Sequence, residues 1–137
     1  MQVQCELVHP WEIINDNKTV QSILEAFGDD NKKNILTTIS EPCVISDIIN
    51  TCSLSRTSGY RKIKELINAG MLVTCGFTLA NNERKIEKYV SVFEGIKIGI
   101  KKNKTTIKVQ FAKNYLDGLP LGMFRKKGQT SKTVLLI

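Results

Sequence analysis

Residues 54–70, LSRTSGYRKIKELINAG, carry the clearest structural signal in the chain. Ser55 is a suitable N-cap, and Gly70 stands where a helix would end in a left-handed C-cap. Gly59, Ile63 and the Leu66-Ile67 pair fall within one arc at helical spacing. The pattern predicts a helix over 55–69 that buries one face and leaves the other polar.

The polar face of this helix carries the candidate functional residues. Thr57, Arg61, Lys64 and Asn68 lie opposite the apolar arc, with Ser58 and Tyr60 on its flanks. Short hydroxyl side chains near a helix N-terminus, together with an Arg, suit hydrogen bonding to base edges in the major groove of DNA. We therefore expect base contacts from Thr57, Ser58 and Arg61, and phosphate contacts from Arg56, Tyr60, Lys62 and Lys64.

The flanking segments place this helix within a larger pattern. Three shorter helices are predicted upstream, at 19–27, about 31–40 and 45–51. Strands at 71–79 and 86–93 follow it, joined by a polar turn at 80–85. This order predicts an α+β winged helix-turn-helix with the 55–69 helix in the major groove. Arg84 and Lys85 fall at the tip of the wing, where backbone or minor-groove contacts are made.

A second hairpin is predicted beyond Gly95. Ile96, Ile98 and Ile100 alternate with other residues, and so do Ile107, Val109 and Phe111. We accordingly expect a DNA-binding domain over 1–95 and a β-hairpin with a C-terminal extension over 96–137. One-faced apolar strands are pairing sites, so we expect a homodimer through the hairpin or the C-terminal end. The alternative is a monomer in which the hairpin folds back on the first helix.

Composition and charge agree with a nucleic-acid partner. The 137 residues suffice for one compact domain. Residues 1–54 hold three Lys/Arg and eight Asp/Glu, a net charge of −5, whereas residues 55–137 hold 17 and five, a net charge of +12. The basic remainder favours binding of double-stranded DNA. No apolar run is long enough for a membrane span and no secretory signal is visible, so we expect a cytoplasmic protein.

Neither catalysis nor cofactor binding is indicated. The four cysteines, at 5, 43, 52 and 75, form no Cys-X-X-Cys pair, and His9 is the single histidine. Such a set does not provide the compact ligands of a zinc site, and buried thiols are the simplest interpretation. No nucleophile motif, paired carboxylates or Gly-rich phosphate loop occurs, so we expect no enzyme, no metal and no cofactor.

Two segments also carry a family resemblance: NILTTISEPCVISDII at 34–49 and LSRTSGYRKIKELINAGMLV at 54–73. Across about residues 20–93 the chain resembles the winged helix-turn-helix transcription regulators of the ArsR-like superfamily. The resemblance implies DNA contacts at Thr57, Ser58, Tyr60 and Arg61, and a homodimer. Metal-sensing members have Cys-Val-Cys on the third helix, whereas this chain has Cys43 and then Ile45. The family's usual dimerisation helix is also not found directly after the wing, where the second hairpin stands in its place.

The sequence is also compatible with two alternative functions. The first is a winged helix used for protein contacts within a transcription complex, although protein-docking versions tend to lose the Arg and Ser/Thr set kept here. The second is a thiol- or metal-responsive regulator in which Cys43, Cys52 or Cys75 controls DNA binding, because Cys52 lies in the predicted turn and Cys75 on a wing strand.

Overall fold

The computed structural model describes residues 10–112, which form an α+β domain. The elements occur in the order β1 (Trp11–Ile14), α1 (Asn17–Phe27), α2 (Asp30–Thr38), α3 (Ile45–Thr51), α4 (Arg56–Asn68), β2 (Leu72–Leu79), β3 (Lys85–Ser91), β4 (Phe93–Lys101) and β5 (Lys104–Phe111).

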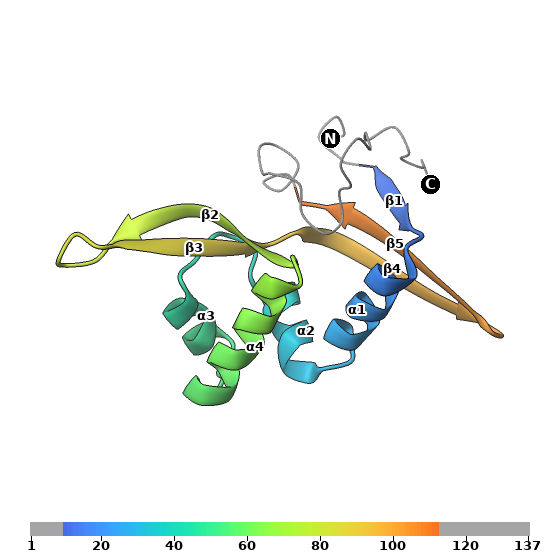
Figure 1. The fold of residues 1–137 in the computed structure, drawn as a ribbon, viewed down its shortest axis with the longest axis horizontal. Helices are drawn as coiled ribbons and strands as arrows, with labels where there is room; N and C mark the ends of the chain where they lie inside the picture. The colour runs from blue at the N-terminus through green and yellow to red at the C-terminus, as the bar shows by residue number, and fades with distance from the viewer. Residues whose placement is uncertain (1–9, 113–137) are drawn as a thin grey trace, which may run out of the picture.

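The strands form two antiparallel sheets. One has the order β1-β5-β4 and the other consists of β2 and β3. Figure 1 shows all four helices on one side of these strands, with the β2–β3 and β4–β5 hairpins extending toward opposite ends of the molecule. The α3–α4 pair lies under the first hairpin and α1 under the second.

Both sheets and all four helices contribute to one hydrophobic core. It includes Ile23 of α1, Ile35 of α2, Ile48 of α3 and Ile63 of α4. From β5 it receives three fully buried side chains, Ile107, Val109 and Phe111. The predicted boundary at residue 95 therefore does not separate two cores: the β4–β5 hairpin folds back on the helices and completes the domain.

Hydrogen-bonding caps set the helix boundaries. Asp29 accepts from Lys32 N at 2.9 Å to start α2, and Ser55 accepts from Ser58 N at 3.2 Å to start α4. After α4, Gly70 has φ 82°, a left-handed conformation that costs glycine little. The predictions of a helix over 45–51 and of Ser55 and Gly70 at the two ends of the next helix are confirmed.

One strand was not predicted, and one strand boundary needs correction. No strand was expected at β1, because four residues are too few to show an alternation. The break predicted near Gly95 falls instead at Val92, whose N–H donates to the carbonyl oxygen of Met71 at 3.0 Å. As a result β3 passes almost directly into β4, and one nearly continuous stretch of chain supplies a strand to each of the two sheets.

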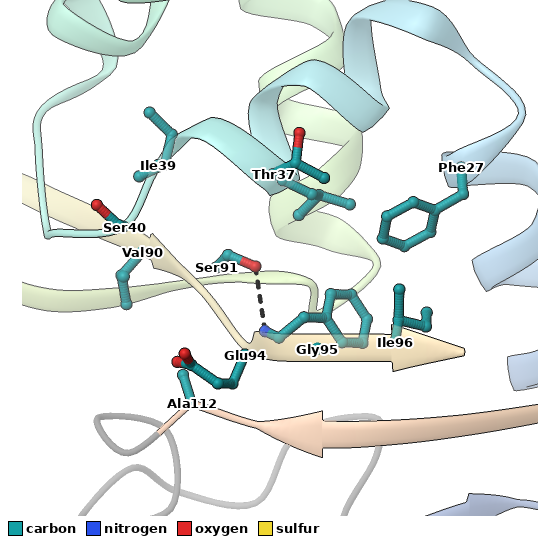
Figure 2. A pocket seen from close by; sticks show the side chains of 12 residues that line it. Phe27, Thr37, Ile39, Ser40, Val90, Ser91, Glu94, Gly95, Ile96 and Ala112 are labelled. Atoms are coloured by element: carbon teal, nitrogen blue, oxygen red, sulfur yellow. Dashed lines mark hydrogen bonds between the residues drawn. The ribbon is translucent and has the colours of Figure 1, made fainter. Parts of the chain in front are cut away.

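A cavity of about 530 Å³ lies beside this junction (Figure 2). Phe27 and Phe93 meet edge to face there, with ring centroids 5.7 Å apart. The dashed line in Figure 2 is the bond from Phe93 N to Ser91 Oγ, at 3.1 Å. Among the described residues that line this cavity, none belongs to the basic set predicted to bind DNA.

Residues 113–137 of the expected C-terminal extension, including the end considered as a dimer contact, lie outside the described residues. Within residues 10–112, no helix has the length and apolar character needed to cross a membrane.

Candidate nucleic-acid interface

The position of α4 depends on a close approach near its N-terminus. A Cβ added to Gly59 would stand 2.8 Å from Leu54 Cβ and 3.4 Å from Ile49 Cγ1, so the segment before α4 packs directly on its backbone. Ser53, in the turn between α3 and α4, adopts a left-handed φ of 55°. Together these features fix the angle between α3 and α4, and hence the direction in which the outer face of α4 points.

Most of the predicted contact residues on α4 are accessible. Tyr60 is 50% exposed, the Arg61 side chain is 59% exposed, and Ser58 is half-buried. The exposed set predicted for DNA contact comprises Arg56, Thr57, Tyr60, Arg61 and Lys64. Lys64 Nζ lies 5.8 Å from the centroid of the Tyr60 ring, a cation–π contact that connects two successive turns of the helix.

Arg61 has an intramolecular partner. Its guanidinium donates to Glu65 Oε2 at 3.3 Å, while Lys32 of α2 pairs with Glu65 Oε1 at 2.9 Å. Lys32 is the larger cause of the lowered pKa of the Glu65 carboxyl, and Arg61 is the smaller one. Arg61 can therefore leave Glu65 at little cost, because Lys32 continues to neutralise that carboxylate and an ion pair this exposed contributes little to stability.

Lys62 does not belong to the exposed face. Its Nζ lies 2.8 and 3.0 Å from the two carboxylate oxygens of Asp29, and its side chain is only 16% exposed. Asp29 is also the N-cap of α2, so one carboxylate holds α2 and α4 together. The expectation that Lys62 contacts phosphate is therefore replaced by a structural role. The sequence pattern could not show this, because the partner lies 33 residues away.

A groove of about 470 Å³ brings α4 and the β2–β3 hairpin together. Its walls come from α3, from the first turns of α4 and from β3. Arg56 and Tyr60 line it from the helix, and Arg84 and Lys85 line it from the hairpin. Four of the nine predicted site residues, from two separate segments of the chain, thus share one basic groove. Thr57, Ser58, Arg61 and Lys64 lie outside its lining on the same helix.

The loop that carries Arg84 is internally hydrogen-bonded. Ala80 N donates to the Arg84 carbonyl oxygen at 2.9 Å, and Arg84 N donates to Asn82 Oδ1 at 3.1 Å. Glu83, which has a left-handed φ of 64°, adds a negative charge next to Arg84 in the sequence. The loop therefore has a defined shape at the end of the hairpin, which projects past α3 in Figure 1.

Two apolar residues of this hairpin are exposed, which the sequence pattern does not predict. Phe77 is 52% exposed and Leu79 is 58% exposed, and Lys85 Nζ lies 4.8 Å from the Phe77 ring centroid. A change of register between Thr74 and Phe77 includes Gly76, whose φ is 86°. A glycine inside a predicted strand is the signal that could have indicated this bulge.

Two of the thiols, Cys43 and Cys52, are partly or fully buried. Burial raises the pKa of the Cys43 thiol and that of Cys52, so both remain protonated and weakly nucleophilic. Cys43 also sits in a β-bridge to Tyr89, with backbone hydrogen bonds of 2.8 and 3.0 Å. Within residues 10–112, no three Cys, His, Asp or Glu side chains are grouped to hold a metal ion.

Comparisons with protein-family models, with curated proteins and with solved structures found no match to this chain.

Proposed function

We propose that this protein is a DNA-binding transcription regulator with a winged helix-turn-helix, in which α3 and α4 are the helix-turn-helix and β2–β3 is the wing. The observation that carries the proposal is the shared groove, with Arg56 and Tyr60 on one wall and Arg84 and Lys85 on the other. A helix and a hairpin that present cations to one groove suit a duplex, since its phosphates line both sides of the major groove.

Base recognition in this proposal comes from the exposed face of α4. Thr57 and Ser58 lie in the first turn of the helix, where short side chains approach base edges most closely. Arg61 lies one turn further and can exchange Glu65 for the two acceptors of a guanine. Arg56, Tyr60 and Lys64 then contact phosphates, as do Arg84 and Lys85 from the wing.

A salt titration of duplex binding tests this proposal. The full chain is titrated into labelled duplex DNA at several salt concentrations and binding is followed by fluorescence anisotropy. We expect affinity to fall steeply with salt, because each neutralised phosphate releases counterions. Lys64→Gln should reduce the salt slope by about 0.9, whereas Lys62→Gln, a matched change on the side of α4 that pairs with Asp29, should leave it unchanged. Binding without salt dependence would contradict the proposal.

A protein-docking function is the second candidate, and the exposed Phe77 and Leu79 favour it. Aromatic and aliphatic side chains at a hairpin surface are typical anchors of protein interfaces. Phe77→Ser with Leu79→Ser distinguishes the two candidates. DNA affinity should change by less than threefold if DNA is the partner, whereas loss of binding to a co-purifying protein with no DNA binding in the parent chain would support docking.

A further inference from the structure

Strand β4 has one edge without a partner strand in the part of the chain described here. Within residues 10–112 the sheet order is β1-β5-β4, so β4 pairs with β5 along one edge and with no strand along the other. Two of its isoleucines are also exposed, Ile98 at 39% and Ile100 at 72%. An open edge with exposed apolar side chains is a template for pairing with another strand.

The backbone of this edge is set up to form a ladder. Lys101 pairs with Lys104 across a two-residue loop, and from that closing pair the direction of the backbone groups alternates along β4. Even-numbered residues therefore direct their N–H and C=O groups to the open edge. The same residues, Ile96, Ile98 and Ile100, share the face of Val109 and Ile107, which is the face that packs on the helices.

From these features we propose that two copies of this chain associate through antiparallel pairing of their β4 strands, with a two-fold axis at Ile98. This register places Ile96 of one copy opposite Ile100 of the other, and Ile98 opposite itself. The apolar inner faces of the two sheets then become continuous across the axis, in a six-stranded sheet.

The regular stretch of β4 and the placement of its lysines select this register. A bulge separates Phe93 from Gly95, and Lys102 lies in the turn with φ 56°, so the regular ladder runs from Gly95 to Lys101. With the axis at Ile98, the midpoint of this stretch, all of it pairs, and Lys97 and Lys101 come opposite glycines. An axis at Lys97 or Gly99 would place lysine directly opposite lysine, which is destabilising. An axis at Ile96 or Ile100 would pair only a short part of the stretch.

Lysines on an edge strand normally discourage pairing, and Lys97 is the central one here. Its ammonium instead lies over the Trp11 ring on the outer face of the sheet, 4.5 Å from the ring centroid. Trp11 reaches across β5 so that its Cη2 is 2.9 Å from where a Cβ on Gly95 would stand. The cation is thus held over the sheet surface by an aromatic contact.

The association does not depend on DNA binding. The β2–β3 hairpin lies at the opposite end of the molecule from the β4–β5 tip, so the pairing leaves the basic groove uncovered (Figure 1). Failure of DNA binding would therefore leave the dimer intact, and failure of the dimer would leave a monomer with the same groove.

Cysteine cross-linking tests the register directly. Opposite residues in an antiparallel ladder have Cα atoms about 5.5 Å apart, within disulfide range, whereas Ile100 of each copy would be four residues from its counterpart. Under mild oxidation we expect Ile98→Cys in the full chain to form a covalent dimer and Ile100→Cys to remain at the wild-type background. Ile100 is the more exposed position, so random collision would favour it. Equal or reversed cross-linking would overturn the register.

A charged side chain at Gly99 provides the second test, with sedimentation of the full chain as the readout. Gly99 comes opposite Lys97 in this register, and an added Cβ there meets no atom closer than 3.9 Å. The wild type should be dimeric at tens of micromolar, and Gly99→Lys should raise the dimer dissociation constant about tenfold by placing lysine opposite lysine. Gly99→Glu, a change of similar size, should not raise it, because the glutamate comes opposite Lys97. A monomeric wild type, or equal effects of the two substitutions, would overturn the proposal. Thermal melting confirms that each variant folds.

Discussion

The two hairpins of this domain are similar in length but differ in what they bury. In β4–β5, Ile107, Val109 and Phe111 are each at most 1% exposed, and β1 covers the outer edge of β5. In β2–β3 only the base is buried, at Leu72 and Val90, and the distal half of β2 is exposed. The exposed part of β2–β3 is available for a partner, whereas β5 completes the core and contributes mainly to stability.

The largest expected difference is in stability. Ile107→Ala removes a fully buried side chain from β5 and should lower the free energy of unfolding by about 2–5 kcal/mol. Leu79→Ala, a matched truncation on β2, should change it by less than about 0.5 kcal/mol. Urea denaturation of both variants measures this contrast. Equal losses would mean that the β2–β3 hairpin is also part of the core.

The second largest effect is expected at Gly59, where α4 packs closely on the segment before it. The Cβ of Gly59→Val would stand 2.8 Å from Leu54 Cβ, so we expect the free energy of unfolding to fall by about 1–3 kcal/mol. Thermal unfolding measures this change. Gly99→Val on β4 is the control, because the nearest atom to an added Cβ there is 3.9 Å away. A wild-type melting temperature in Gly59→Val would show that the α3–α4 packing is looser than the structure indicates.

The β2–β3 hairpin should affect DNA affinity rather than stability. Replacing Arg84 and Lys85 by Ala removes two cations of the groove and should weaken binding to all duplex sequences about equally, by roughly tenfold. The matched change in the other hairpin, Lys101→Ala with Lys104→Ala, should leave affinity within about threefold. A change of preferred sequence in the Arg84 and Lys85 variant would assign base recognition to the hairpin.

The smallest expected effect concerns the ion pair that joins α2 and α4. The Lys62 ammonium and the Lys32 backbone N–H lower the pKa of the Asp29 carboxyl, so the charged form stabilises the folded state. That contribution is present above the unfolded-state pKa of 3.8 and is lost as pH falls through the lower folded-state value. Asp29→Asn keeps an N-cap and should cost under about 1 kcal/mol at pH 7, a difference that disappears once the pH has fallen below the folded-state pKa. Urea unfolding at several pH values measures it, and a pH-independent difference would contradict this origin.

The sequence predicted the local features well and the long-range ones poorly. Ser55, Gly70 and the 45–51 helix are determined by neighbours within a few residues, and all three were predicted correctly. The strand at Trp11–Ile14 depends on pairing with β5, almost 100 positions away, and was missed. The sequence also left open whether the second hairpin would fold back, which depends on how much of the helical surface β5 covers.

In the candidate site, too, local features were predicted from the sequence and long-range contacts were not. The spacing on α4 predicted an outer face with Thr57, Arg61 and Lys64, and all three are exposed. Lys62 was expected to contact phosphate, because a charge pattern does not reveal a distant carboxylate such as Asp29. The partnership of Arg84 and Lys85 with α4 followed from the expected order of elements, whereas the exposed Phe77 depends on a bulge that no simple alternation predicts.

The central claim, that the exposed face of α4 binds specific duplex DNA, is tested most directly by selecting bound duplexes from a random pool with the wild type and with Arg61→Ala. The wild type should enrich a defined sequence, and Arg61→Ala should bind it more weakly by about 1–3 kcal/mol and lose the preference for guanine at one position. Equal weakening on the selected and random duplexes would reduce Arg61 to a phosphate contact. No enriched sequence for the wild type, with no salt-dependent binding to the pool, would contradict the account.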